Sequence, residues 1–237
     1  MARELGIHIQ PSDRWCWWLR NAALSYEMPR QLEGTVEADR LYHTAGSKGQ
    51  AQQGGKKSLG RRPRRRRKKR EPGRGHDDKD RPAMIVWVSR QGSVVVHAVR
   101  DFTISTVPTT ADLAVHAGSR LYTDSASRYR ALKGYVREFV NHTRKAYACG
   151  DVHENRAECL FSLLKPYLRV FRGLSKTNLP GYLGFFQFLR NYRQLTAFEQ
   201  AGLILYAALD PAISSRARKG EFVKCLDHFD LLQMQRN

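Results

Sequence analysis

The chain has 237 residues, enough for one large domain or two small ones with a buried core. Its net charge of +19 and pI of about 10.2 favour a polyanionic partner, and nucleic acid is the first candidate. No apolar run reaches the roughly 18 residues that a membrane span requires, and the cysteines include no Cys-x-x-Cys pair. These features disfavour a membrane protein and a zinc site, and they fit a reducing compartment.

The N-terminal segment, residues 1–30, is predicted to form two helices separated by a turn at Gly6. Ser12 or Asp13 is the expected cap of the second helix. Two short helices in this order are typical of the second half of a helix-turn-helix unit, which would make the segment a partial DNA-binding module. A plain helical hairpin packed on the rest of the chain is the alternative.

The next part of the chain is predicted to contain strands. Apolar and polar residues alternate over residues 33–41, which indicates a strand. Residues 43–82 are rich in Gly, Gln, Lys and Arg, and this composition predicts a disordered basic insertion. Two β-branched runs, 84–88 and 93–99, flank residues 90–92, a pattern typical of a β-hairpin.

The remainder alternates between predicted helices and strands. Helices are expected at 109–116, 125–132, 153–165, 178–192 and 199–209, and strands at 120–124 and 135–141. Pro166 is expected to end the third of these helices, and Gly181 or Gly184 to interrupt the fourth. This order predicts a mixed α/β domain over residues 31–205, followed by a C-terminal tail at 206–237.

Three acidic residues occupy positions suited to metal chemistry. Asp39 and Asp124 each end a predicted strand, and Glu158 lies on the predicted helix 153–165. Mg²⁺ prefers hard carboxylate oxygens, so acids from two strand ends and a helix can converge on divalent cations. Two such ions about 3.5–4 Å apart activate an attacking oxygen and stabilise a leaving one, which predicts phosphoryl transfer.

The helix that carries Glu158 has a second polar feature. Asn155, Glu158, Ser162 and Lys165 share one face, beside an apolar stripe that is expected to be buried. A carboxylate, an amide and an ammonium group on one face suit the binding of metal and DNA. A solvated polar face is the commoner reading of such a pattern taken alone.

Several of these segments form an ordered set over roughly residues 1–205. The set comprises Val36–Asp39, Leu121–Asp124, Gly150–Asn155, Glu158, Ser162–Lys165 and Phe171–Lys176. In this order they resemble the catalytic signature of bacterial insertion-sequence transposases of the DDE type, in the branch with an ISXO-like domain. Val36–Asp39 is similar to the family's first-aspartate strand and Leu121–Asp124 to its second.

The resemblance implies an RNase H-like mixed sheet flanked by helices. It implies that Asp39, Asp124 and Glu158 hold two Mg²⁺ or Mn²⁺ ions, and that Lys165 is the basic residue that follows the third acid in many DDE enzymes. Some relatives are described with asparagine in the third role, so Asn155 stays open as a ligand or substrate contact. We favour Glu158 because a carboxylate neutralises a divalent cation better than an amide does.

The chain also departs from the family pattern. Arg40-Leu41 follows the first aspartate, where relatives usually carry Glu-Thr or Glu-Ser, and Cys159 stands where glycine commonly follows the third acid. Relatives begin with a zinc ribbon and a whole helix-turn-helix, and the resemblance implies that this chain starts inside the latter. An N-terminally truncated member of the family is therefore expected.

A strongly basic run follows the first predicted acidic strand. It contains Arg61, Arg62, Arg64, Arg65, Arg66, Arg67, Lys68, Lys69 and Arg70. Such side chains contact DNA phosphates without reading bases, and Lys165 is a further candidate for DNA binding. A charged tail with no single role and a nuclear-import patch are the alternatives.

The sequence thus predicts a DNA transposase that cleaves and transfers the strands of an insertion sequence. We expect it to act on terminal-repeat and target DNA as a homo-oligomer, without membrane contact, in the cytoplasm and near the nucleoid. A catalytically inactive DNA-binding remnant is one alternative. An RNase H-like nuclease, which cuts but joins nothing, is another.

Overall fold

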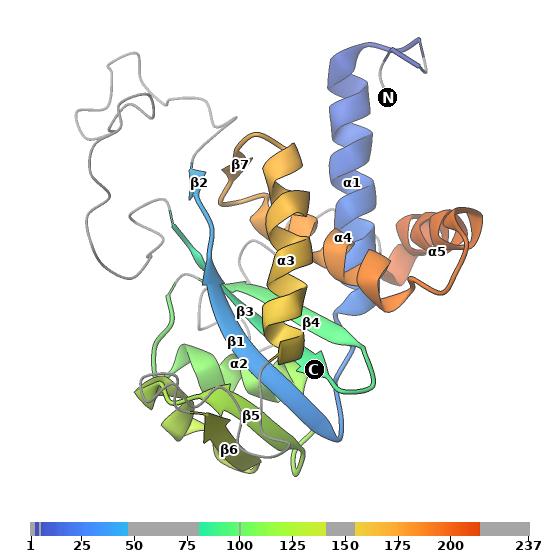
Figure 1. Cartoon of the computed structure of the whole chain (residues 1–237). Helices are drawn as coiled ribbons and strands as arrows, with labels where there is room; N and C mark the ends of the chain where they lie inside the picture. The colour runs from blue at the N-terminus through green and yellow to red at the C-terminus, as the bar shows by residue number, and fades with distance from the viewer. Residues whose placement is uncertain (1–2, 5, 47–80, 100, 141–154, 214–237) are drawn as a thin grey trace, which may run out of the picture.

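A computed structural model of the chain describes residues 3–4, 6–46, 81–99, 101–140 and 155–213. Within these residues a five-stranded sheet forms the centre of the molecule, with helices on both of its faces (Figure 1). Its strands, in spatial order, are β4 (Val94–Val99), β3 (Ala83–Ser89), β1 (Thr35–Tyr42), β5 (Arg120–Asp124) and β6 (Val136–Val140). The predicted mixed α/β class and the predicted hairpin at 84–99 are both confirmed.

The sheet is mixed, and its parallel half brings β1 beside β5. β3 runs antiparallel to both β1 and β4, whereas β1, β5 and β6 are parallel. Val36 lies opposite Leu121, and Ala38 lies opposite Thr123, and an aspartate follows each of the last two. Asp124 ends β5 as predicted, but β1 continues past Asp39 to Tyr42, so the prediction that Asp39 ends its strand is wrong.

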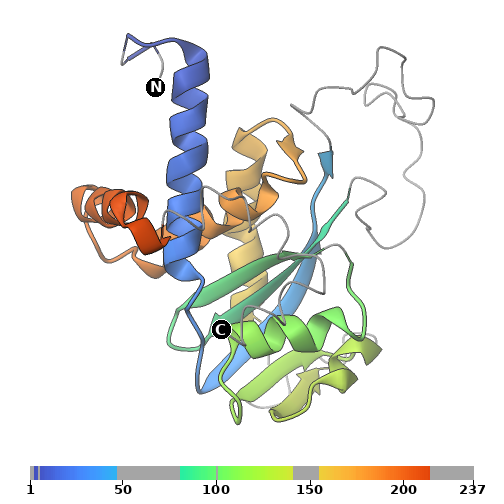
Figure 2. The same cartoon turned by 180° about the vertical axis from the view of Figure 1, so that it is seen from behind.

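The described residues contain five α-helices. They are α1 (Ile9–Glu27), α2 (Thr106–Ala114), α3 (Asn155–Val170), α4 (Leu179–Asn191) and α5 (Ala197–Leu209). α3 crosses one face of the sheet, and α2 covers the opposite face (Figures 1 and 2). No helix in the part of the chain that the structure describes is long and apolar enough to cross a membrane.

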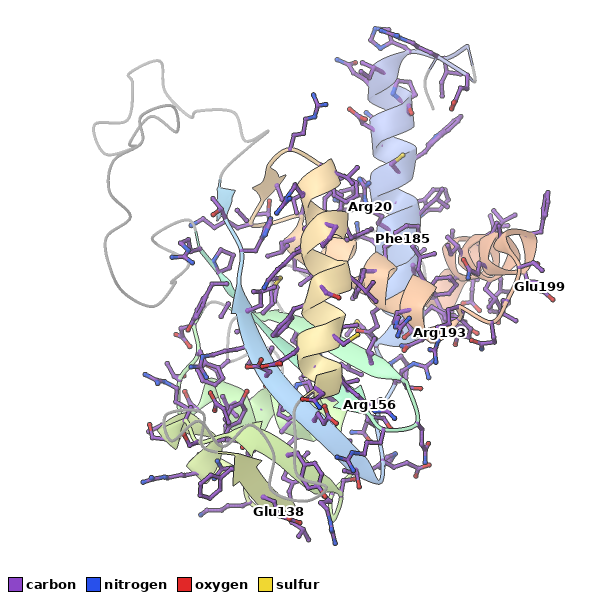
Figure 3. All side chains as sticks on the ribbon, viewed as in Figure 1. Arg20, Glu138, Arg156, Phe185, Arg193 and Glu199 are labelled. Atoms are coloured by element: carbon purple, nitrogen blue, oxygen red, sulfur yellow. The ribbon has the colours of Figure 1, made fainter. Side chains whose placement is uncertain are left out.

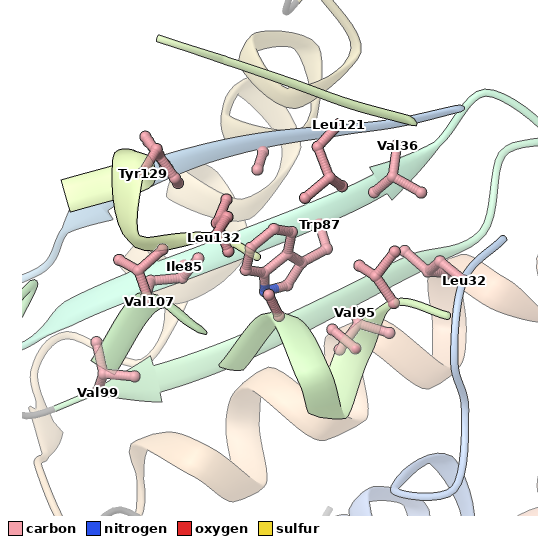
Figure 4. Close-up of a cluster of buried hydrophobic side chains, with 14 of the residues drawn as sticks. Leu32, Val36, Ile85, Trp87, Val95, Val99, Val107, Leu121, Tyr129 and Leu132 are labelled. Carbon is pink, nitrogen blue, oxygen red and sulfur yellow. The ribbon is translucent and has the colours of Figure 1, made fainter. Parts of the chain in front are cut away.

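The period of two along the strands divides the core into two layers. On the α2 side, Val36, Trp87, Val107, Leu121 and Tyr129 form one buried cluster (Figure 4). On the α3 side, the second cluster contains Met84, Val86, Leu160, Leu164 and Phe186. Alternation along β1 sends Val36 and Ala38 to the first layer, and Leu41 packs against the second. Asp39 therefore belongs to the α3 side of the sheet.

The N-terminal segment forms one helix and not the predicted pair. Arg3 and Glu4 lie in a turn, and Gly6 adopts a left-handed φ of 63°. The nitrogen Nδ1 of His8 accepts a hydrogen bond from the Gln10 backbone, so α1 begins before the two residues predicted to cap it. α1 packs against α4 and α5, and the partial helix-turn-helix stays a prediction.

Two glycines in α4 serve close packing and do not interrupt the helix, contrary to the sequence expectation. α4 runs unbroken from Leu179 to Asn191. A methyl group placed at Gly184 would lie 2.5 Å from Cβ of Leu24, and one at Gly181 would lie 3.3 Å from Oδ1 of Asn21. The absence of side chains at these positions therefore lets α1 approach α4 closely.

The boundaries of α3 also correct the prediction. The helix continues through Pro166 to Val170 and is followed by Arg172 and Gly173, both at positive φ. Pro166 is exposed, so the carbonyl that loses its partner there can face water, while Leu164 and Leu168 on either side stay buried. Burial of the apolar stripe therefore outweighs the local cost of proline.

Three smaller differences concern short elements. The predicted helix at 125–132 is only a 3-10 helix, Ser127–Ala131, and α2 begins before residue 109 and ends at Ala114. The start of the predicted disordered insertion contains a two-residue strand, β2 (Ala45–Gly46), which pairs with β7 (Leu174–Ser175). The rest of that insertion, from 47 to 80, lies outside the described residues.

Candidate functional site

Asp39 and Asp124 lie side by side on neighbouring parallel strands. In the β1–β5 register Ala38 lies opposite Thr123, and the next residue of each strand is one of these two aspartates. Asp124 is the last residue of β5, as predicted, whereas Asp39 lies within β1, which continues to Tyr42. The structure thus brings together two of the three predicted acids.

A buried glutamate attaches the start of α3 to β1. The Glu37 side chain is completely buried, and its Oε2 accepts hydrogen bonds from the backbone nitrogens of Arg156, at 2.8 Å, and Ala157, at 3.4 Å. Figure 3 shows Arg156 at this end of α3, over the sheet. A carboxylate at a helix N-terminus satisfies free N–H groups and the helix dipole. Glu37 therefore fixes the helix that carries the third predicted acid.

Glu158 lies within the next turn of α3 and is exposed. Burial is the main cause that raises the pKa of Asp39 to about 6. Repulsion from Asp124 and Glu158 raises it further. The backbone N–H of Arg40 and the charge of its side chain act in the opposite direction. Asp124 and Glu158 are therefore both close enough to Asp39 to raise its pKa.

Arg40 is the cation of this cluster. Its Nη1 donates to Oδ2 of Asp124 at 2.8 Å, and its backbone nitrogen donates to Oδ1 of Asp39 at 2.6 Å. The other oxygen of Asp124 accepts from the backbone nitrogen of Ala126 at 2.8 Å. The guanidinium also lies over the ring of Phe102, 4.7 Å from its centroid.

The donor set is suited to Mg²⁺ or Mn²⁺, since it consists of carboxylate oxygens gathered in a crowded, partly buried place. The arrangement is nevertheless not that of a finished metal cage. Among the residues described, no group of three or more His, Cys, Asp or Glu side chains is placed so as to hold one metal ion. Both oxygens of Asp124 already have hydrogen-bond donors, Nη1 of Arg40 and the backbone nitrogen of Ala126.

The other predicted site residues lie along α3 or outside the described chain. Asn155 is the first residue of α3 and is exposed. Lys165 is exposed about 10 Å along the helix from Glu158, and its Nζ lies 5.7 Å from the Phe161 ring centroid. The predicted buried stripe of this helix, beside Lys165, is confirmed. The basic run from Arg61 to Arg70 lies outside the described residues.

Two residues of the site were not recognised for their roles in the sequence. Glu37 stands two positions before Asp39, and the period of a strand places both on one face. That spacing was the available signal for a second acid facing α3. Arg40 was noted only as a departure from the family pattern, although a cation directly after an acid is a ready partner for neighbouring carboxylates.

A mixed α/β domain with aspartates side by side on two parallel strands agrees with the expected DDE-type transposase domain. Residues 31–191 match the family model described as the ISXO2-like transposase domain, and the chain belongs to this family. The predicted relationship to insertion-sequence transposases is thereby confirmed.

A relative from an insertion element supports the same placement. The chain is 32% identical over 188 residues to an uncharacterized protein in transposable element ISH50 of Halobacterium salinarum. The alignment covers 77% of this chain and 61% of that relative, so the chain spans less than two thirds of its length. No solved structure shows a significant match.

Proposed function

We propose that the chain is a DNA transposase in which Asp39, Asp124 and Glu158 form a metal-dependent site for strand cleavage and strand transfer. The observation that carries this proposal is the β1–β5 register, which puts Asp39 beside Asp124, and the effect of Glu158 on the pKa of Asp39 supports it. The mixed sheet, with β1 at its centre and the first acid on that strand, supports an RNase H-like assignment.

The reaction would proceed by in-line displacement at a phosphodiester. Water attacks first, and the freed 3′-hydroxyl then attacks target DNA. Two divalent ions, Mg²⁺ or Mn²⁺, would supply activation of the attacking oxygen and stabilisation of the leaving one. Asp39 and Asp124 would present ligand oxygens from the sheet, and Glu37 holds the start of α3, the helix from which Glu158 would supply the third.

DNA is the proposed partner. The net charge of +19 favours a polyanion, and the basic run Arg61–Arg70 supplies cations for phosphate contacts that read no bases. Lys165, exposed on α3, is the proposed basic residue that follows the third acid along that helix. We propose that the protein acts as a homo-oligomer that holds terminal-repeat and target DNA.

The test is Mg²⁺-dependent nicking and strand transfer on DNA that carries the element's terminal repeats. Asp124→Ala is expected to abolish both products. Glu33→Gln is the matched control, because Glu33 is an exposed acid that precedes β1, at the end remote from Asp39. Persistence of cleavage in Asp124→Ala would remove this site assignment. Cleavage without any joined product would instead identify a nuclease.

The third ligand can be assigned by comparing two substitutions on α3. Glu158→Gln is expected to weaken Mn²⁺ binding by about tenfold or more, because it removes a charged ligand. Asn155→Ala is expected to change it less than about threefold. The reverse ranking would assign the third role to the asparagine.

One observation favours a second candidate, a DNA-binding remnant without catalysis. Arg40 occupies Asp124 with a guanidinium 2.8 Å away. Salt-sensitive DNA binding, with no cleavage at any Mg²⁺ or Mn²⁺ concentration, would support this alternative. Metal-dependent cleavage of any DNA would exclude it.

A further inference from the structure

The side chain that follows the first acid of this site reaches across the sheet edge to the second. Arg40 belongs to β1, yet its Nη1 lies 2.8 Å from Oδ2 of Asp124 on β5. The side chains of Arg40 and Asp124 are 20% and 19% exposed, so the pair is partly shielded from water. A charge-assisted hydrogen bond at this distance is among the stronger polar contacts in proteins.

One aromatic contact and one backbone hydrogen bond hold this arrangement in place. The Phe102 ring lies beneath the guanidinium, 4.7 Å away, which suits the planar group of arginine. The Ala126 backbone nitrogen donates to the remaining oxygen of Asp124, at 2.8 Å. Both oxygens of Asp124 therefore have protein donors, and one of these donors carries a full positive charge.

We propose that Arg40 is a built-in counter-ion that competes with divalent metal for Asp124 and so lowers the metal affinity of this site. The proposal rests on the proposed function, because it takes Asp124 to be a metal ligand. A metal ion at Oδ2 must displace the guanidinium or share the oxygen with it. Sharing is opposed by repulsion between the two cations, which is strong in a partly buried place.

The contact also answers the negative charge that the acids share. Repulsion among Asp39, Asp124 and Glu158 would favour any nearby cation. Because Arg40 directly follows Asp39 in the chain, its guanidinium is always present at a high local concentration beside Asp124. Metal binding is therefore a competition against a tethered ligand, and its outcome depends on the free metal concentration.

The proposal predicts the effect of removing the guanidinium charge. Arg40→Gln is expected to tighten Mn²⁺ binding by about tenfold, the lower end of what loss of a competing charge-assisted contact implies. Arg40→Met, which keeps an unbranched stem against Phe102, is expected to behave in the same way. Arg40→Lys keeps the charge and is expected to stay within about threefold of the original dissociation constant.

Arg128→Gln is the matched control. Arg128 also lies over the Phe102 ring, at 5.7 Å, so this substitution removes one positive charge from the same neighbourhood. It is expected to leave the Mn²⁺ dissociation constant within about twofold, since long-range charge effects are weaker than direct contact. A tenfold gain in Arg128→Gln would show that net charge, and not the Arg40 contact, sets the affinity, and would overturn the proposal.

The experiment is a titration of the full chain with Mn²⁺, with free ion measured by electron paramagnetic resonance and folding checked by thermal melts. Each variant is repeated with Asp39→Asn, which is expected to weaken binding strongly in every background. Wild-type affinity in Arg40→Gln and Arg40→Met, with binding that still depends on Asp39, would overturn the role of Arg40 alone. Binding that ignores Asp39→Asn would overturn the proposed site and this inference together.

Discussion

Two polar clusters, one at the junction of α1 with α4 and one where β1 lies beside β5, show opposite ways of accommodating a carboxylate. At the first, the buried Glu27 accepts hydrogen bonds from Nε and Nη2 of Arg30 and from the amides of Gln187 and Asn191. At the second, repulsion from two other acids adds to burial in raising the pKa of Asp39 to about 6. The carboxylate of the first cluster has enough hydrogen-bond donors to balance its charge, whereas the second cluster carries an excess of negative charge.

The difference indicates what each cluster contributes. A buried carboxylate with several donors, one of them a bidentate arginine, joins elements and costs stability when it is removed. A group of mutually repelling acids destabilises the folded chain, and such strain is typical of sites that await a ligand. The Glu27 cluster therefore serves the architecture, and the Asp39 cluster serves the proposed chemistry.

The largest effect is expected on activity. Asp39→Asn should reduce strand cleavage by at least about 10³-fold, equivalent to roughly 4 kcal/mol in the barrier. Glu27→Gln should leave cleavage by the folded protein within about tenfold, since Glu27 lies on α1, away from the sheet edge that carries the acids. Nicking assays well below the melting temperature measure both, and an equal loss in the two variants would break the comparison.

The next effect concerns stability at the Glu27 cluster. Glu27→Ala should lower the free energy of unfolding by about 3 kcal/mol, because it leaves Arg30, Gln187 and Asn191 without their shared acceptor. Urea unfolding followed by circular dichroism checks the value. A loss below about 1 kcal/mol would mean that water replaces the carboxylate and that the cluster is not a structural joint.

The sequence was sufficient for much of the sheet but not for the contacts between segments. β5 was predicted with its observed bounds, because alternating patterns and turn residues act locally. The single helix α1, its close approach at Gly184 and the passage of α3 through Pro166 depend on tertiary packing, which propensity does not contain.

The site divides in the same way. Asp39, Asp124 and Glu158 were identified from strand ends, helix position and a family resemblance, and the structure places them near one another. The contact of Arg40 with Asp124 spans two strands that are distant in the chain, so it depends on the β1–β5 register. No local sequence pattern specifies that register. The role proposed for Arg40 could therefore be inferred only from the structure.

A smaller effect of opposite sign is expected for stability at the acidic edge. Because the folded-state pKa of Asp39 is raised to about 6, ionisation of this group opposes folding. Its unfavourable contribution grows as pH rises from about 4 to about 6 and is constant above that range. Asp39→Asn should therefore raise the free energy of unfolding by about 2 kcal/mol at pH 8, without added metal.

This gain should disappear on acidification. Below about pH 4 the carboxyl is protonated in both the folded and unfolded states, so asparagine and aspartic acid should confer similar stability. Melting temperatures of the two proteins at pH 8 and pH 4 provide the measurement, and Glu33→Gln serves as a control for removal of an exposed acid. A gain that persists unchanged at pH 4 would show that it arises from packing and not from charge.

The smallest effect tests how far the Glu27 cluster extends toward the sheet. Gln187 donates to Oε2 of Glu27 at 3.1 Å and accepts from the Val96 backbone nitrogen at 2.9 Å, on the edge strand β4. Gln187→Met, of similar length, should cost about 1 kcal/mol, since it removes one of several donors and leaves one backbone N–H without this acceptor.

A double-mutant cycle with Glu27→Ala separates the two contacts of Gln187. Coupling of about 0.5–1 kcal/mol is expected between the two sites, because they share a hydrogen bond. The part of the cost that remains in the Glu27→Ala background then belongs to the Val96 contact. Additive losses would mean that α4 covers the β4 edge independently of α1, and that the junction is two neighbouring contacts and not one cooperative cluster.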